Sequence, residues 1–341
     1  MRAILTEEQE MLKATAGRIA DSAAVTTPAD LARLDRGAAW AELAAAGLLG
    51  MRVRGEDGAP MTSGVELMLV ARSLAGALSP VPFVGVALAA ELLARAGAPD
   101  AWVSDIAEGH VRYAVLLNPT LDGLAEGAGG VCIDAEDADY GLALAKDAAG
   151  VRLCRLPLAA GSARDGVDLT RPIALVDHGS PEPIGRPLSE ADLQAWTALA
   201  LTLVCADIVG VLGAGLTRVV DYAKTRIQYG APIGSFQAVQ HMCAEMLVDT
   251  QAAASLSNYA AWCVDAVSPA EALLAARTAK AYCAPMAQKV GEMLMQTWGG
   301  IGQVWEHEGH LRTRRAMFDR KLFGDEAFQL LAIAATRMER A

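Results

Sequence analysis

Apolar and polar residues alternate with a helical period at the start of the chain. Residues 5–23, LTEEQEMLKATAGRIADSA, have apolar residues spaced along one face of a helix: Leu5, Met11, Leu12 and Ile19. Thr6 is a suitable N-cap residue, and the glutamates that follow it favour the positive end of a helix dipole. The pattern therefore predicts an amphipathic helix that begins after Thr6.

Three further helical patterns follow in the first third of the chain. They occupy residues 38–53, 64–78 and 86–98, and glycine or a Ser-Pro-Val-Pro break at residues 79–82 ends each of them. We expect a helical N-terminal domain over residues 1–112.

From about Val111 the pattern changes to short apolar runs separated by Gly, Asp and Pro turns: RYAVLLNP, GVCIDA, YGLALAKDAAGVRLCRL and PIALVDH. These runs predict a small, reduced β domain over residues 113–187. Long helical patterns then return after Ser189 and Asp192, both of which are suitable N-cap residues. A helical C-terminal domain is expected over residues 188–341, so the fold class is mainly α with a small β domain.

Residues 195–220, AWTALALTLVCADIVGVLGAGLTRVV, are apolar enough to cross a bilayer. Asp207 stands in their middle, and a central carboxylate costs about 2.5 to 3.5 kcal/mol on membrane insertion. The stretch has no strong positive anchor upstream, and the chain offers no second candidate span. We therefore interpret it as a helix buried in a bundle.

Charge and cysteine usage narrow the class of protein. The 29 Lys and Arg against 40 Asp and Glu give a net charge of −11, which argues against nucleic acid and anionic lipid surfaces as partners. The six cysteines include no Cys-x-x-Cys pair, and no signal-peptide pattern opens the sequence. We expect reduced thiols and a cytoplasmic location.

One polar segment lies at a helix junction. Residues 226–241 read RIQYGAPIGSFQAVQH and carry an arginine, three glutamines and two aromatic residues around a turn rich in Gly and Pro. The Arg226 guanidinium offers a permanent charge and a fork that matches phosphate oxygens, and amides at a helix start add further donors. A surface ion pair is the alternative role of Arg226.

A second segment, QTWGGIGQVWEHEGHLRTRRAMFDRK, spans residues 296–321. Its glycines let backbone amides approach a pyrophosphate, although the same pattern also ends ordinary helices. His307 and His310 have a spacing that could suggest a metal, but no third ligand cluster accompanies them, so we interpret them as part of a polar loop. The basic residues that follow are interpreted as forming solvated or interdomain ion pairs: Arg312, Arg314, Arg315, Arg320 and Lys321.

Together the two segments resemble the acyl-CoA dehydrogenase family, and LTEEQEML and WAELAAAGLLGMRV resemble its opening helices. The resemblance implies an N-terminal helical domain, a middle β-barrel-like domain and a C-terminal four-helix bundle. It also implies removal of an α proton and a β hydride from an acyl-CoA substrate, with FAD as cofactor and an electron-transfer acceptor that reoxidises it.

In that family, the two segments reach across a dimer interface to the adenosine diphosphate half of a flavin that the neighbouring subunit mainly holds. The resemblance thus implies that Arg226 pairs with the pyrophosphate, that Gln228 and Tyr229 flank it, and that Gln237 hydrogen-bonds the dinucleotide. It also implies an adenine end lined by four residues of the second segment: Gln296, Thr297, Gly299 and Gly300.

Several family features are missing here. The Thr-Glu-Pro, Gly-Ser-Asp and Trp-Ile-Thr segments that cradle the flavin ring have no counterpart in LLNPTLDGLAEGAGG, residues 116–130. The catalytic glutamate is expected at Phe323, or in some members at Ala200, and neither residue is a carboxylate.

A positioned base is required for the reaction, so two nearby carboxylates, Asp325 and Asp207, are substitute candidates. Asp207, in an apolar helix, is expected to have a raised pKa, and a buried carboxylate with satisfied hydrogen bonds is its alternative role.

The sequence therefore leads to a non-catalytic small subunit of a heteromeric acyl-CoA dehydrogenase. A larger partner subunit would supply the flavin cradle and the base in an α2β2 assembly, resembling those that act on CoA thioesters of steroid or bile-acid side chains. The alternatives are a self-sufficient homomeric enzyme with a relocated carboxylate base, and a scaffold subunit that binds no flavin. The intact Arg226 and Gln296 segments argue against the scaffold.

Overall fold

The computed structural model describes residues 4–55, 58–148, 150–177 and 179–338. Its N-terminal part consists of α1 (Glu7–Ser22), α2 (Pro28–Arg33), α3 (Arg36–Ala45), α4 (Gly64–Gly76), α5 (Phe83–Ala96) and α6 (Asp100–Ala107). Thr6 and Gln9 form a reciprocal capping box at the start of α1, with the Thr6 hydroxyl accepting from the Gln9 amide at 3.3 Å. The predicted N-cap is confirmed.

Two of the predicted helices have different bounds. The pattern at residues 38–53 suggested one helix, but α3 ends at Ala45 and the chain turns at Gly47, whose φ of +71° no helix accommodates. The apolar residues Leu48, Leu49 and Met51 still enter the core, as a loop. The helix predicted over residues 86–98 is α5. It begins earlier, at Phe83, directly after Pro82.

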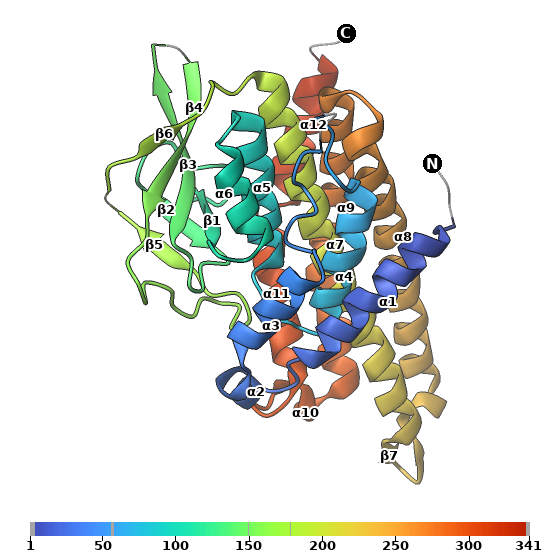
Figure 1. The fold of residues 1–341 in the computed structure, drawn as a ribbon. Coiled ribbons are helices and arrows are strands. Elements are labelled where there is room, and N and C mark those ends of the chain that lie inside the picture. Colours follow the sequence, from blue (N-terminus) through green and yellow to red (C-terminus); the bar gives the residue numbers. More distant parts are fainter. Residues whose placement is uncertain (1–3, 56–57, 149, 178, 339–341) are drawn as a thin grey trace.

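The middle of the chain forms one six-stranded sheet in the order β5-β2-β1-β3-β4-β6. Its strands are β1 (Tyr113–Leu117), β2 (Gly130–Ile133), β3 (Tyr140–Asp147), β4 (Gly150–Pro157), β5 (Ala174–Val176) and β6 (Glu182–Ile184). Among the strand pairs of the described residues, β1 and β3 run parallel and the others antiparallel. Strands β3 and β4 form a hairpin with Asp147 opposite Gly150. The sheet lies to one side of the helices, with α5 packed against β1 (Figure 1).

The rest of the chain is helical. It contains α7 (Glu190–Thr225), the short strands β7 (Ile227–Gln228) and β8 (Ala231–Pro232), the 3-10 turn η1 (Ile233–Ser235), α8 (Gln237–Ala266), α9 (Pro269–Trp298), α10 (Gly300–Gln303), α11 (Glu308–Lys321) and α12 (Glu326–Met338). Ser189 caps α7 in a capping box with Asp192, as the sequence indicated. In the described ranges α7 is the one helix long and apolar enough to span a membrane, and 89% of its apolar window is buried in the bundle. The prediction of a bundle helix is confirmed.

Because α8 runs back along α7 and α9 runs back along α8, the end of α7, the start of α8 and the end of α9 lie at the same end of the bundle (Figure 1). The β7–β8 hairpin projects beyond that end. The bundle thus brings both polar segments found in the sequence to one end of the molecule.

A buried ionic network joins the sheet region to the bundle. Arg171 donates to Asp134 at 2.7 Å and also contacts Asp319 on α11, while Arg315 holds Asp207 of α7 with two hydrogen bonds of 2.7 Å. All five side chains are at most 5% exposed. The ion pair of Arg315 thus lies within the helical C-terminal part, and Arg315 reaches the other parts of the chain through hydrogen bonds to the Ser79 carbonyl at 2.9 Å and the Thr170 hydroxyl at 3.0 Å. All six cysteines are free thiols, as expected.

Candidate functional site

The first polar segment folds as a tight hairpin. The backbone of Ile227 and Gln228 pairs with Pro232 and Ala231, and the turn places Tyr229 and Gly230 at φ of 53° and 79°. Two consecutive positive φ values are the signature of a type I′ turn, which glycine at the second position favours. Tyr229 is consequently 98% exposed at the tip.

The side chains of this segment are presented to solvent. Arg226 follows the last residue of α7, Gln237 is the first residue of α8, and both are exposed. Within the described residues, neither side chain has a hydrogen-bond or ion-pair partner, which does not favour the surface-ion-pair role for Arg226. Gln228 differs, because its Nε2 donates to the carbonyl of Ile227 at 2.6 Å.

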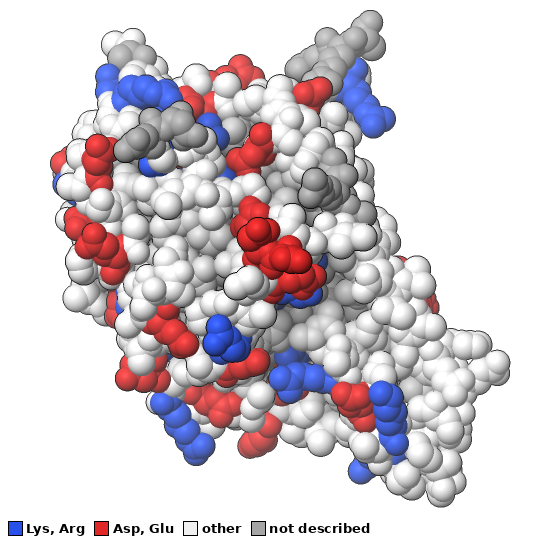
Figure 2. Space-filling model, turned by 45° about the vertical axis from the view of Figure 1, so that its right-hand side comes forward, with Lys and Arg blue, Asp and Glu red and all other residues white. Residues whose placement is uncertain are grey.

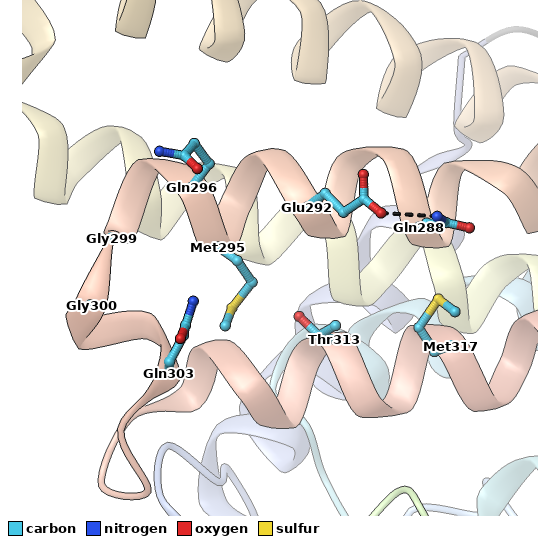
Figure 3. A pocket seen from close by; sticks show the side chains of 9 residues that line it. All are labelled: Gln288, Glu292, Met295, Gln296, Gly299, Gly300, Gln303, Thr313 and Met317. Carbon is cyan, nitrogen blue, oxygen red and sulfur yellow. Dashed lines mark hydrogen bonds between the residues drawn. The ribbon is translucent and has the colours of Figure 1, made fainter.

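A cavity of about 660 Å³ lies beside the second polar segment, between α9, α10 and α11 (Figure 3). Of the four residues expected at an adenine end, Gln296, Gly299 and Gly300 line it. Thr297 lies outside it, since its side chain is turned into the core and its hydroxyl donates to the Met293 carbonyl at 2.8 Å. Gln296 and Thr297 face different sides of α9 because adjacent side chains on a helix point about 100° apart.

Six further residues line the cavity that the sequence patterns did not single out. They are Gln288, Glu292, Met295, Gln303, Thr313 and Met317. Helical spacing could have indicated several of them. Positions 288, 292 and 296 are four apart and share one face of α9, and positions 313 and 317 are four apart on α11. Gln288 and Glu292 are joined by a hydrogen bond of 2.9 Å along the cavity wall (Figure 3).

The predicted polar loop around His307 has a structural use. The His307 Nδ1 accepts the Gly309 amide at 3.0 Å and so caps α11, while its ring packs edge-on against Trp298. His310 stacks on Trp305 and contacts its carbonyl through Nε2 at 3.0 Å. The two imidazoles thus hold the loop between α10 and α11, two helices that contribute residues to the cavity.

The residues at this end of the bundle fit the adenosine diphosphate part of a flavin nucleotide. Arg226 supplies an uncompensated cation, and α8 begins without a side-chain cap, which leaves its first amides for an anion. A Cβ at Gly299 or Gly300 would meet nothing within 4 Å, so the backbone there is open to a ligand. The cavity itself combines amide side chains with the thioethers of Met295 and Met317, which suits a flat heterocycle.

Both positions expected for a catalytic glutamate lie in the closed core. Ala200 is 0% and Phe323 2% exposed. The Phe323 ring meets Trp196 edge-on at 5.7 Å, and its amide donates to the Leu121 carbonyl at 2.6 Å. Phe323 adopts a φ of 59°, a left-handed conformation that these contacts hold. An apolar stack thus occupies the position where the family places its base.

The two substitute carboxylates are both engaged. The expected rise of the Asp207 pKa is wrong: burial does favour the neutral form, but the bidentate Arg315 guanidinium outweighs it and lowers the pKa. Asp325 pairs with Lys321 and accepts the Phe328 amide at 3.3 Å at the start of α12, and these contacts lower its pKa too. A carboxylate with a lowered pKa is a weak proton acceptor.

Comparison with known proteins places these features in a family. The acyl-CoA dehydrogenase N-terminal domain profile matches residues 6–109, and the C-terminal domain profile matches residues 200–338. The acyl-CoA dehydrogenase IpdE2 of Mycobacterium tuberculosis is 30% identical over 252 residues, which are 74% of this chain and 71% of that protein.

Two solved structures share the fold over nearly the whole chain. One is the ChsE4-ChsE5 complex of Mycobacterium tuberculosis, with a TM-score of 0.84, 24% identity and 99% of each chain covered. The other is the Tcur3481-Tcur3483 steroid acyl-CoA dehydrogenase, with a TM-score of 0.81, 22% identity and 98% of each chain covered. With its two matched domains, its IpdE2 relative and its shared architecture, the chain belongs to the acyl-CoA dehydrogenase family.

Proposed function

We propose that this chain is the non-catalytic subunit of a heteromeric, FAD-dependent acyl-CoA dehydrogenase. It completes the adenosine diphosphate side of a flavin site whose ring cradle and catalytic base belong to a larger partner subunit. One combination of observations supports the proposal: buried Ala200 and Phe323 occupy the expected base positions, while Arg226, Gln237 and Gln296, which we propose as nucleotide contacts, are exposed at one end of the bundle.

Each residue of this site would have a defined task. Arg226 would neutralise the pyrophosphate, Gln237 and the first amides of α8 would donate to its oxygens, and Gln296, Gly299 and Gly300 would border the adenine. Gln228 and Tyr229 would flank the pyrophosphate from the hairpin. When bound, FAD supplies the hydride acceptor for acyl-CoA dehydrogenation.

The surface around this site suits a protein partner. Large apolar side chains are exposed on the hairpin, on α8 and around α10: Ile227, Tyr229, Phe236, Leu247, Val248, Ile301, Val304 and Trp305. Figure 2 shows that the projecting end of the bundle, at the lower right, carries few charged side chains at its tip. Exposed apolar patches of this kind mark protein interfaces, and a flavin held by a second subunit would lie against this end.

The structural neighbours support the heteromer and its substrate class. One neighbour is a complex of two chains, ChsE4 and ChsE5, and the other is a steroid acyl-CoA dehydrogenase of two chains, Tcur3481 and Tcur3483. By extension, we propose a CoA thioester with a bulky, steroid-like acyl group as substrate for the assembled enzyme.

Flavin content tests the proposal. The chain is purified alone and together with a larger acyl-CoA dehydrogenase subunit that carries the family's glutamate. Alone it should hold almost no FAD after gel filtration, because the ring cradle is missing. The co-purified α2β2 complex should hold FAD and reduce it with acyl-CoA. The chain's mass and flavin absorbance are recorded in the same run.

The alternatives predict other results. Stoichiometric FAD on the isolated chain, with flavin reduction by acyl-CoA, would establish the self-sufficient homomeric enzyme. A stable complex whose FAD content and affinity do not depend on this chain would establish the flavin-free scaffold.

A further inference from the structure

A second cavity, of about 400 Å³, is lined by Asn258 and Trp262 from the second half of α8, whereas the proposed flavin contacts on that helix lie at its first residue. Its lining residues come from α1, α4 and α8; α4 packs on each of the other two, on the side of the molecule away from the sheet (Figure 1). Its volume lies within the usual range of small-molecule sites. Arg72 of α4 lines one wall, and Lys13 of α1 lies at the exposed rim.

Arg72 is a cation without a counter-ion. Its Nη2 donates to the Asn258 Oδ1 at 2.8 Å and lies 3.5 Å from the Ser257 hydroxyl. Its Nε is buried and has no hydrogen-bond partner. Burial lowers the pKa of this guanidinium to about 10, so it stays charged at neutral pH. The Arg72 side chain as a whole is half-buried, and a partly desolvated charge without a counter-ion destabilises a fold unless a ligand supplies its partner.

The carboxylates of this region already have other partners. Glu66 accepts Gln9 Nε2 at 2.6 Å and closes the capping box of α4 with Ser63. Asp265 accepts the Gly64 amide at 2.6 Å and contacts Arg52. Among the described residues, no carboxylate lies within ion-pair distance of Arg72.

The remaining wall of the cavity has an apolar part, and the polar residues Thr6, Gln9, Ser63 and Ser73 form the rest. Leu5 comes from α1's N-terminal side, Val65 and Leu69 from α4, and Trp262 from α8. Leu69 is 5% exposed, so the floor belongs to the core. A guanidinium beside the apolar part of such a pocket favours ligands that have one anionic group and an apolar body.

We propose that this cavity binds an amphipathic monocarboxylate, with the carboxylate on Arg72 and the apolar body against Leu69, Val65 and Trp262. The ligand supplies the counter-ion that the fold does not provide. The site is independent of the flavin-binding end, since none of its lining residues belongs to the segments proposed to bind FAD.

Sodium octanoate is a suitable probe, titrated by calorimetry into the full chain. We expect saturable binding, at least tenfold tighter than that of 1-octanol, which has the same apolar body without the charge. Arg72→Met keeps the length of the side chain and removes the charge, and should weaken octanoate at least tenfold. Arg277→Met is the matched control, because Arg277 also has a buried, unpartnered Nε but lines a different cavity. It should bind octanoate like the unmodified chain.

Asn258→Asp provides a second, independent variant. It places a carboxylate where the Arg72 partner now stands, so it should abolish octanoate binding and raise the melting temperature. If Arg72→Met fails to fold, octanoate binding by Asn258→Asp still tests the proposal. Absence of saturable octanoate binding, equal affinity for octanol, or full binding by Arg72→Met or Asn258→Asp would overturn the proposal. FAD retention in the complex should be unchanged in both variants, which separates this site from the flavin function.

Discussion

The Arg226 side chain has no ion-pair partner among the residues that the structure describes. It follows the last turn of α7, its amide donates to the Tyr222 carbonyl at 2.8 Å, and its side chain extends into solvent. Nearby Lys224, by contrast, pairs with Asp221 at 3.1 Å. Two cations on the same helix end thus have different surroundings, which makes them a matched pair for mutagenesis.

In the assembled complex, Arg226→Ala should weaken FAD binding by about 1.5 to 3 kcal/mol, or roughly ten- to a hundredfold, because a pyrophosphate would lose its charge-assisted partner. Arg226→Lys should recover only part of this loss, since an ammonium keeps the charge without the fork. FAD retained after dialysis is the measurement, with the mass of the complex as a check of assembly. Lys224→Ala should retain FAD normally; equal retention in Arg226→Ala would make Arg226 an ordinary surface residue.

The two aspartates considered as bases should respond differently to substitution. Asp207→Asn leaves Arg315 buried and unpaired, so we expect a loss of about 3 to 5 kcal/mol in the free energy of unfolding. Asp325→Asn removes a partly exposed pair with Lys321 and should cost less than about 1 kcal/mol. Urea denaturation measures both. Turnover per bound FAD should persist in each folded complex, and its abolition by either change, with FAD still bound, would identify that aspartate as the base.

At the scale of single elements, α7 depends on its first turn. The Ser189 hydroxyl accepts the Asp192 amide at 3.1 Å, and the Asp192 carboxylate accepts from Ser189 and from Arg186. Burial opposes the ionised form of Asp192, but these hydrogen bonds outweigh it and lower its pKa. This helix forms the centre of the bundle, so its start influences the whole C-terminal half.

Ser189→Ala should lower the free energy of unfolding by about 1 kcal/mol at neutral pH. The Asp192 pKa is lower in the folded than in the unfolded chain, so its contribution is present above the unfolded value of about 3.9 and is lost as pH falls through the folded value. The difference between Ser189→Ala and the unmodified chain should therefore shrink below about pH 4. Denaturation curves at pH 7 and in the acid range measure it, and a pH-independent difference would contradict the assigned cause.

At the scale of the whole molecule, buried ion pairs hold the sheet region on the bundle. Arg171 reaches Asp134, beside the sheet, and Asp319, on α11, and Asp134 also accepts the Gly85 amide of α5 at 2.8 Å. The region beside the sheet, helix α5 and helix α11 of the bundle are therefore linked through Arg171 and Asp134.

Arg171→Met should cost about 3 to 5 kcal/mol, since it leaves the Asp134 carboxylate buried without its cation. Arg314→Met, on the same helix as Asp319 but partly exposed, should cost less than about 1 kcal/mol. Equilibrium unfolding by urea compares the two. Similar small losses would show that packing alone joins the sheet to the bundle.

Features that depend on neighbouring residues could be predicted from the sequence. Thr6 and Ser189 act as N-caps because a hydroxyl and a residue three positions later suffice to satisfy the first amides. The family and the fold class followed from two motifs and from periodicity. Residues 195–220 form a bundle helix, as the carboxylate in their middle indicated.

Features that depend on distant partners emerged only once the chain was folded. The sequence suggested a raised pKa for Asp207, but its partner Arg315 is 108 residues away, and only the packing of α11 on α7 brings the two charges together. Thr297 was grouped with Gln296 by motif, yet helix rotation turns it into the core. Arg72 shows the converse: its lack of a counter-ion becomes visible only when α1, α4 and α8 surround it. Charge compensation is a property of three-dimensional neighbours, so local patterns cannot specify it.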